Sequence, residues 1–221
     1  MGNLPEPTGL WLEELSTPYY QFVDAGFKVD IASIKGGKVP LDPRSIQDIG
    51  KNEASVDKFL SSAENMASIT TTVSIEDVKF TDYDVIFFPG GHGAVWDFPN
   101  QPILADAITS ALNNEKVVAS VCHGPAAFIG VKDSDGDYLV SGRKVAGFTN
   151  QEEDAVGLTE SVPFLLENEL KRMGGLYQKG DMFTSFVVKD GNLITGQNPA
   201  SSHAVGKLVI KTVRSNLEAK K

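Results

Sequence analysis

The stretch Lys116-Val-Val-Ala-Ser-Val-Cys122-His123-Gly124-Pro125-Ala-Ala-Phe128 decides the fold class. A continuous apolar run leads directly into Cys-His-Gly-Pro and then into residues that suit a helix. A buried strand, a sharp turn and a helix in this order are typical of a nucleophile elbow, which lifts one side chain to the carboxyl edge of a sheet. Gly124 permits the tight backbone, and Pro125 suits a first helical turn. The pattern predicts a reactive cysteine, Cys122, at that edge.

The chemistry of such a cysteine depends on its surroundings. Amides at the start of the following helix, together with the helix dipole, favour the thiolate over the thiol, so we expect a lowered pKa for Cys122. The alternative is a small buried cysteine with a packing role, the more common environment of this residue. The strand, turn and helix around Cys122 favour the functional interpretation.

Apolar patterns along the rest of the chain predict alternating strands and helices. Short continuous apolar runs indicate central strands of a sheet covered on both faces, and apolar pairs every four residues indicate helices with one buried stripe. The predicted strands are residues 27–32, 85–88 and 117–121; the predicted helices include 103–112 and 162–170, and residues 186–195 form a hairpin. This alternation predicts a doubly wound α/β sheet.

The chain forms one domain, residues 1–221, because neither a repeat nor a linker divides it. Its 221 residues, 41% of them hydrophobic, are enough for a sizeable core. The polar stretch 42–74 is expected to be a peripheral helical or loop insertion.

Charge and cysteine content narrow the function classes. The net charge of −9 and the pI of about 4.8 disfavour nucleic-acid binding, since a polyanion would be repelled. We find neither an apolar run of membrane-spanning length nor a signal peptide, so no membrane partner is expected. A single cysteine cannot form an internal disulfide, and we therefore expect a cytoplasmic protein.

A second glycine-rich turn follows the predicted strand 85–88. The sequence Pro89-Gly90-Gly91-His92-Gly93 is expected at the same sheet edge as Cys122. Gly90 and Gly91 allow a backbone amide to point into the cleft and stabilise an oxyanion. A phosphate-binding loop is disfavoured, because neither the Walker motif nor GxGxxG is present.

Histidines and acids supply candidates for a base and its partner. The three histidines, His92, His123 and His203, lie in glycine-rich or turn-rich motifs, a weak indication of a shared cleft. They lack a second thiolate and ligand spacing, so no metal is expected. Glu14 and the pair Glu152–Glu153 are candidate acids, although carboxylates near helix starts are ordinarily solvated caps.

Taken together, these motifs resemble the ThiJ/PfpI (class I glutamine amidotransferase-like) family, and within it the glyoxalase III-like branch of small heat-shock proteins. The resemblance covers nearly the whole chain in the family's order. The matching stretches are residues 8–18, 24–33, 40–45, 88–93, 121–125, 147–153 and 196–203.

The resemblance implies a flavodoxin-like sandwich, with a mostly parallel central sheet between helices, and usually a homodimer. It implies Cys122 as the nucleophile, His123 as the proton shuttle and Glu153 as the acid that supports the histidine, with Glu152 left open for that place. Glu14 matches the family's protonated acid beside the cysteine.

The Gly90–Gly91–His92 loop is expected to bind the oxyanion or substrate, with Gly91 as the amide donor. The resemblance also leads us to expect a hydrophobic strand ahead of residue 8, which the start Met1-Gly2-Asn3 does not supply. We therefore expect that this first central strand is missing or that the start is truncated, and either case is expected to expose neighbouring strands.

The function implied by the resemblance is a glyoxalase III-type lyase that needs neither glutathione nor any other cofactor. Its substrate would be a small dicarbonyl, methylglyoxal, converted to lactate through a cysteine hemithioacetal in detoxification or stress response. Two alternatives stay open. One is a cysteine amidase, peptidase or protein deglycase, and the other is a holdase chaperone or a redox sensor based on oxidation of Cys122.

Overall fold

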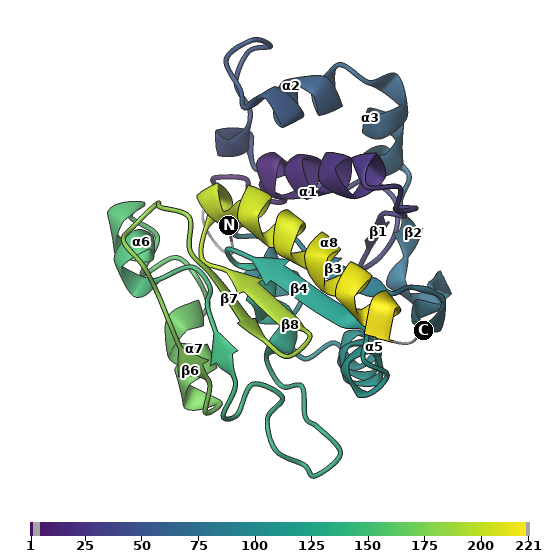
Figure 1. Cartoon of the computed structure of the whole chain (residues 1–221). Coiled ribbons are helices and arrows are strands. Elements are labelled where there is room, and N and C mark those ends of the chain that lie inside the picture. The colour runs from purple at the N-terminus through teal and green to yellow at the C-terminus, as the bar shows by residue number, and fades with distance from the viewer. Residues whose placement is uncertain (2–4, 220–221) are drawn as a thin grey trace.

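A four-stranded sheet forms the centre of the protein, whose computed structural model describes residues 1 and 5–219. The strand order is β3 (Val85–Phe88), β4 (Val117–Val121), β8 (Leu193–Gly196) and β7 (Val187–Asp190). The first three strands are parallel and β7 runs antiparallel to β8, with Val85 opposite Val117 and Val118 opposite Leu193. Helices lie on both faces of this sheet (Figure 1). The predicted flavodoxin-like α/β fold and the 186–195 hairpin are confirmed.

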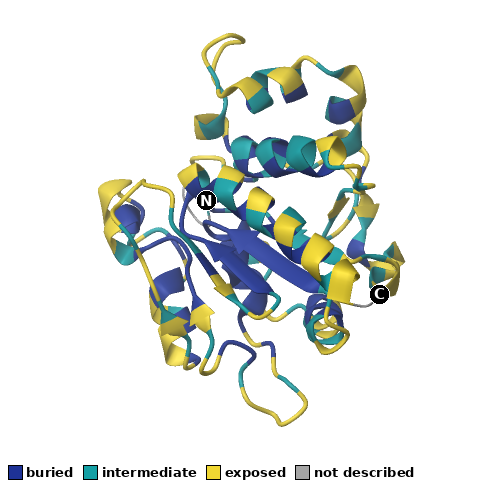
Figure 2. Ribbon diagram, viewed as in Figure 1, coloured by how far each residue is buried: buried dark blue, intermediate teal, exposed yellow. Residues whose placement is uncertain are grey.

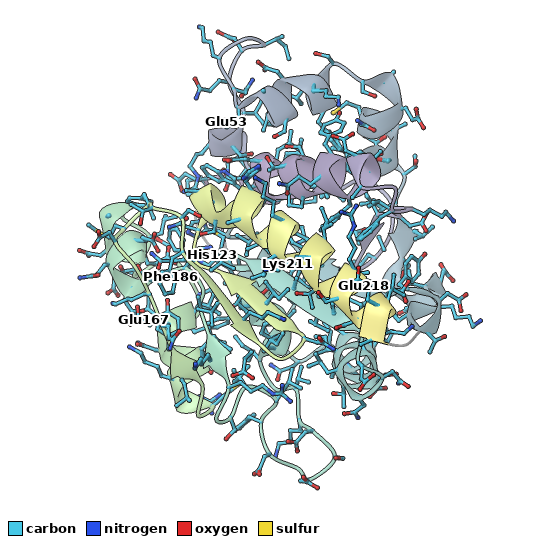
Figure 3. The ribbon with its side chains drawn as sticks, viewed as in Figure 1. Glu53, His123, Glu167, Phe186, Lys211 and Glu218 are labelled. Carbon is cyan, nitrogen blue, oxygen red and sulfur yellow. The ribbon has the colours of Figure 1, made fainter. Side chains whose placement is uncertain are left out.

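Strand β4 is buried along its whole length, as its uninterrupted apolar sequence predicts (Figure 2). Val117, Ala119 and Val121 pack with α8 (Ser202–Ala219) and with Phe22 of α1 (Leu12–Asp24). Val118 belongs to the core on the opposite face. The outer face of α8 carries the exposed Lys211 and Glu218 (Figure 3).

The second face is covered by the remaining helices of the core. These are α4 (Ala94–Asp97), α5 (Pro102–Asn113), the 3₁₀ helix η4 (Gly124–Phe128) and α7 (Leu166–Arg172), with α6 (Asn150–Ala155) beside α7. Leu104, Ile108 and Ala111 form the buried stripe of α5, which confirms the helix predicted over 103–112. The helix predicted over 162–170 begins later, at Leu166, because Val162 lies in the turn before it. A short pair, β5 (Lys144–Val145) with β6 (Leu176–Tyr177), flanks this region.

The polar stretch 42–74 forms a peripheral layer over α1, as predicted. It contains the 3₁₀ helix η1 (Pro43–Ser45), α2 (Ala54–Leu60) and α3 (Ala63–Thr70). Phe59 and Ile69 from this layer and Leu12 from α1 are almost fully buried against one another. This satellite core fixes the start of α1, where Glu14 lies.

The strand predicted over 27–32 is reduced to β1 (Ala32–Ser33), which pairs with β2 (Val73–Ser74) rather than with the central sheet. Strand β3 is therefore an edge strand of the central sheet. Among the described residues, no strand fills the space between β3 and the separate β1–β2 pair. A cavity of about 610 Å³ occupies this position, lined by Ile31 and Ala32 and by β3. Val73 at its wall is 51% exposed. The expected exposure of β3 is limited, because Val85 and Phe87 are half-buried and Ile86 and Phe88 are buried; residues 2–4 lie outside the described residues.

None of the helices described for residues 1 and 5–219 has the length and apolar character that a membrane crossing requires.

Gly124 provides a test of how tightly the elbow packs against β3. A Cβ at this position would lie 2.1 Å from the Phe88 carbonyl oxygen, a backbone atom that cannot move away alone. We expect Gly124→Ala to lower the free energy of unfolding by about 3 kcal/mol or more, at or above the usual cost of overpacking. Urea denaturation measures this loss. Gly180→Ala is the matched control, because its Cβ would meet only the Phe186 side chain at 3.0 Å; an equal loss in both variants would contradict the packing argument.

Candidate active site

Cys122 sits on a strained turn at the carboxyl end of β4. Its φ of 60° lies in the left-handed region, which a residue with a side chain rarely adopts. Two backbone hydrogen bonds hold it there: the Cys122 amide donates to the Gly196 carbonyl at 3.0 Å, and the Phe148 amide donates to the Cys122 carbonyl at 2.9 Å. The predicted elbow is therefore present, and the helix that follows it is the 3₁₀ helix η4.

His123 lies between the thiol and an acid. Its Nδ1 is 3.4 Å from the Cys122 Sγ, and its Nε2 is 2.8 Å from Oε2 of Glu153. Burial, reinforced by the neighbouring His92, lowers the pKa of His123 to about 4 against the attraction of Glu153. At neutral pH the ring is therefore uncharged. Because an ionised carboxylate only accepts, Nε2 carries the proton and the Nδ1 lone pair faces the thiol.

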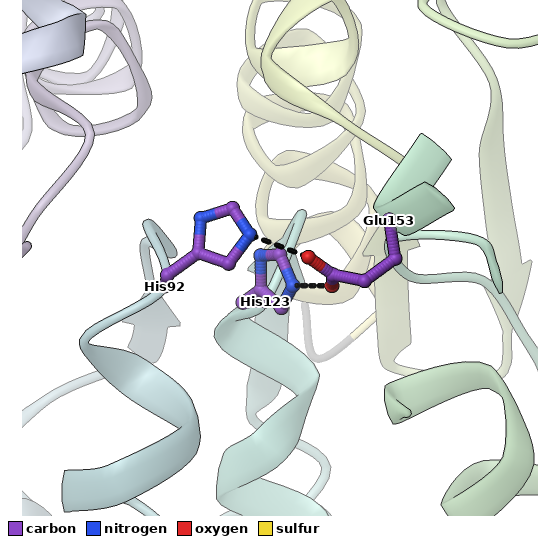
Figure 4. Close-up of side chains that lie close together, drawn as sticks. All are labelled: His92, His123 and Glu153. Atoms are coloured by element: carbon purple, nitrogen blue, oxygen red, sulfur yellow. Dashed lines mark hydrogen bonds and ion pairs between the residues drawn. The ribbon is translucent and has the colours of Figure 1, made fainter. Parts of the chain in front are cut away.

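Glu153 is a buried carboxylate shared by two imidazoles (Figure 4). Besides His123, it accepts a hydrogen bond from His92 Nε2 on Oε1 at 2.7 Å. Burial alone would raise the pKa of Glu153, but the hydrogen bonds from His123 and His92 outweigh it and lower the pKa to about 2. The acid is thus ionised.

Glu152 and Glu153 make different contacts, which favour Glu153 as the acid beside His123. Glu152 forms a capping box with Thr149 at the start of α6. Its Oε1 accepts hydrogen bonds from the Phe183 amide and from the side chains of Gln197 and Asn198. Glu152 therefore holds loops together, and Glu153 is the acid that contacts the histidines.

Glu14 reaches the site from the first turn of α1. Its Oε2 accepts a 2.6 Å hydrogen bond from the Gly90 amide. Its other oxygen, Oε1, is buried without a hydrogen-bond partner among the described residues, and the carboxyl group lies close enough to interact with the Cys122 side chain. Complete burial raises the pKa of Glu14 well above its usual value. A neutral carboxylic acid has an O–H to donate, so Glu14 can stabilise negative charge on the sulfur.

The expected lowering of the Cys122 pKa is wrong. Burial and the adjacent Glu14 raise the pKa of the thiol, against the smaller opposing effect of the Gly91 and His123 amides. Loss of hydration therefore raises the pKa of the thiol by more than the short 3₁₀ helix after the elbow lowers it. Cys122 is therefore a thiol at rest, and the His123 Nδ1 lies 3.4 Å from its sulfur as a candidate proton acceptor.

Two backbone amides, those of Gly91 and His123, approach the sulfur. Gly91 has a φ of 92°, and a Cβ there would lie 2.2 Å from the Gly9 carbonyl oxygen, so only glycine fits this turn. The Gly90 amide is already bound to Glu14, and both ring nitrogens of His92 have partners. The substrate-binding role expected for Gly90 and His92 stays a prediction, and their contacts favour support of the site.

Arg44 and Asp42 are site residues that no sequence motif assigns to the site. Asp42 is fully buried and binds the Arg44 guanidinium through both carboxylate oxygens, at 2.9 Å to Nε and 2.6 Å to Nη2. Arg44 Nη2 also lies 3.1 Å from His92 Nδ1. The sequence Asp42-Pro43-Arg44 predicts a capped turn, but not which distant histidine it meets.

Of the three histidines, the structure brings two together. The rings of His92 and His123 lie 4.2 Å apart between centroids, and both contact the Phe148 ring. His203 is exposed on α8, so the shared cleft expected for all three is wrong for that residue. His92, His123 and Glu153 place their ligand atoms within 4.8 Å of one another, a set of residue types that can hold a metal ion.

The elbow with its cysteine, histidine and two buried acids defines the class of protein. Residues 8–212 match the DJ-1/PfpI family, and the chain belongs to that family. The fold and the family resemblance expected from the sequence are therefore both confirmed.

Individual relatives are similar over almost their whole length. Glyoxalase 3 of Candida albicans is 30% identical over 217 residues, covering 95% of this chain and 91% of the relative. The glutathione-independent glyoxalase HSP31 of Saccharomyces cerevisiae is 29% identical, covering 94% and 90%. Among solved structures, the Rapid Encystment Protein of 24 kDa from Francisella tularensis superposes with a TM-score of 0.92 at 39% identity, covering 96% and 93%. The crystal structure of C. albicans glyoxalase III gives 0.87 at 28%, covering 96% and 91%.

The lowered pKa of His123 makes a prediction about stability. Between pH 6.5 and about 4 the unfolded chain binds a proton at this residue and the native protein does not, so its contribution to stability falls as the pH falls. Relative to His123→Gln, the wild type should lose up to about 1.4 kcal/mol of unfolding free energy per pH unit in this window.

Urea denaturation at pH 7.5, 6.5, 5.5 and 4.5 measures this difference. His203→Gln is the matched control, and its profile should run parallel to that of the wild type. A constant difference between wild type and His123→Gln at all four pH values would show that folding does not shift the pKa of His123 and would contradict the prediction.

Proposed function

We propose that this protein is a glutathione-independent glyoxalase, a lyase that converts methylglyoxal to lactate with Cys122 as the nucleophile. One observation carries the proposal: Cys122 lies in contact with a neutral, oriented imidazole and a neutral carboxylic acid, in a family whose similar members are named glyoxalases. The thiol, its proposed base and its proposed charge-stabilising donor thus lie together in one buried site. None of the steps proposed below uses a metal or a cofactor.

The first step is addition of the thiol to the aldehyde carbon. The S–H proton moves to His123 Nδ1, the S–C bond forms, and the carbonyl electron pair moves to oxygen. The amides of Gly91 and His123 approach the same sulfur and are proposed to bind this oxyanion. The oxyanion then takes the proton back from His123 to give a hemithioacetal, leaving the base neutral again.

The second step is an internal proton transfer. His123 takes the C1 proton as the electron pair of the C2 carbonyl moves to its oxygen, and it returns that proton to C2 of the resulting enediolate. The hydroxyl proton on the C1 oxygen passes to the C2 oxygen, which gives the lactoyl thioester of Cys122. Glu153 holds the ring in place and stabilises its charged form, since the Nε2 hydrogen bond of 2.8 Å becomes an ion pair when Nδ1 is protonated. Water then cleaves the thioester and releases lactate and the thiol. The sequence is redox-neutral, because C1 is oxidised as C2 is reduced.

Burial of the thiol favours a small substrate. Cys122 is only 4% exposed, so a three-carbon dicarbonyl reaches the sulfur more easily than a modified side chain of a macromolecule. A bacterial relative, 29% identical over 203 residues, is named a protein and nucleic acid deglycase. Deglycase activity is therefore the second candidate function. Its first step would be displacement of the amine from the hemiaminal carbon by the same thiol: the S–C bond forms, the C–N bond breaks, and the proton from sulfur goes to the leaving amine.

The test is lactate formation from methylglyoxal without glutathione. The wild type should produce lactate, and Cys122→Ala should produce none above the uncatalysed rate, because no other cysteine is present. Release of amines from glycated peptides is measured in parallel. Lactate formation unaffected by Cys122→Ala would sink the proposal, and amine release faster than lactate formation would favour the deglycase.

Two substitutions of Glu14 separate a neutral donor from a charged acid. Glutamine can accept from the Gly90 amide with its oxygen and donate to the sulfur with its NH₂ group, so Glu14→Gln should keep kcat/KM within about tenfold. Glu14→Leu removes both contacts and should lower it by about 10²–10³, the usual cost of one charge-stabilising donor. Steady-state kinetics at pH 7 decide, and equal losses in both variants would mean that an ionised Glu14 is required.

A further inference from the structure

The contact between Arg44 and His92 determines where the His92 proton lies. A guanidinium has five N–H donors and no acceptor. Arg44 Nη2 lies 3.1 Å from His92 Nδ1, so Nδ1 must accept and carries no proton. The proton of the neutral ring is then on Nε2, where it is donated to Glu153 Oε1 at 2.7 Å. Only this tautomer gives one donor and one acceptor both to the Arg44–His92 contact and to the His92–Glu153 contact.

Asp42 keeps Arg44 in the orientation that this path needs. The Asp42 carboxylate is fully buried and holds the guanidinium at two points. It also accepts from the Thr8 hydroxyl and the Arg44 amide. The Arg44 side chain is 37% exposed, whereas the Asp42 side chain that fixes its position is fully buried.

The same tautomer decides whether the neighbouring cluster can take a metal. The side chains of His92, His123 and Glu153 are buried, and two imidazoles with one carboxylate are a common ligand set for zinc and related ions. A ligating nitrogen needs its lone pair free, so a metal on His92 Nε2 would require the proton on Nδ1. That proton would point at an Arg44 N–H, donor against donor. The positive charge of Arg44, which interacts with Glu153, adds repulsion of a cation.

We propose that Arg44 is a positioning residue that locks His92 in the Nε2–H tautomer, and thereby both orients Glu153 and excludes divalent transition metals from the His92–His123–Glu153 cluster. Without Arg44 the His92 proton can move to Nδ1, and the three side chains become a metal site. The ligands of that site include the proposed base, so a bound ion would block the reaction. Only this last consequence rests on the proposed function.

The tautomer is measured directly in the wild-type protein. Long-range ¹H–¹⁵N NMR spectra distinguish the two tautomers, and the chain has only three histidines to assign with His92→Gln, His123→Gln and His203→Gln. We expect His92 in the Nε2–H form at pH 7. Observation of the Nδ1–H form, or of a doubly protonated His92, would overturn the proposal without reference to any activity.

A second experiment tests the exclusion of metal. It compares Zn²⁺ affinities by calorimetry in a Cys122→Ala background, which removes the thiol as a ligand. Arg44→Met should bind Zn²⁺ at least about tenfold more tightly than its parent, a change of about 1.4 kcal/mol. Adding His92→Gln should abolish the gain. Arg214→Met, which removes a guanidinium that contacts the Ala25 carbonyl instead, is the matched control and should change nothing.

Equal Zn²⁺ affinity in parent and Arg44→Met, or tight binding that survives His92→Gln, would contradict the proposal. If Arg44→Met does not fold, because Asp42 is left buried without its cation, the wild-type NMR measurement still decides. Failure of the glyoxalase proposal would appear separately, as absence of lactate from a wild-type protein with the expected His92 tautomer.

Discussion

The site depends on one buried carboxylate that has two imidazole donors. Burial of an unpaired Glu153 would be costly, and its ionised form persists because both oxygens accept N–H bonds of 2.7 and 2.8 Å. Each donor is then constrained at its other nitrogen. His123 turns its lone pair toward the thiol, and His92 turns its lone pair toward Arg44. The buried negative charge of Glu153 thus determines which nitrogen carries the proton in both His92 and His123.

The backbone that carries these groups is equally constrained. Cys122 adopts a left-handed φ and Gly91 a φ that a side chain would disfavour, and the turn of Gly91 packs directly onto Gly9. Three segments far apart in the chain therefore meet through main-chain atoms rather than through adjustable side chains. This close approach explains how Glu14, from the first helix, reaches a cysteine at position 122.

The parts predictable from sequence are those whose cause is local. The apolar run before Cys122 predicts a buried strand, and the glycines after each strand predict turns at one edge, as the structure confirms. The contact of Arg44 with His92 has no local cause, since 47 residues separate them. The raised pKa of Cys122 likewise follows from burial by distant segments, which outweighs the short helix on which the opposite expectation rested. Adjacent acids such as Glu152 and Glu153 differ only by helical position, which turns one toward the loops and the other toward the histidines.

The cavity between β1 and β3 extends beyond the edge of the central sheet to the turn that contains Gly90. Its wall includes Gly9, Leu10 and Gly90, and the Gly90 amide is the group that binds Glu14. A compound seated among these apolar residues would press on the back of the turn while leaving the sulfur untouched. Because Cys122 is not among the residues that line this cavity, a ligand there would act on the turn that holds Glu14 rather than on the thiol.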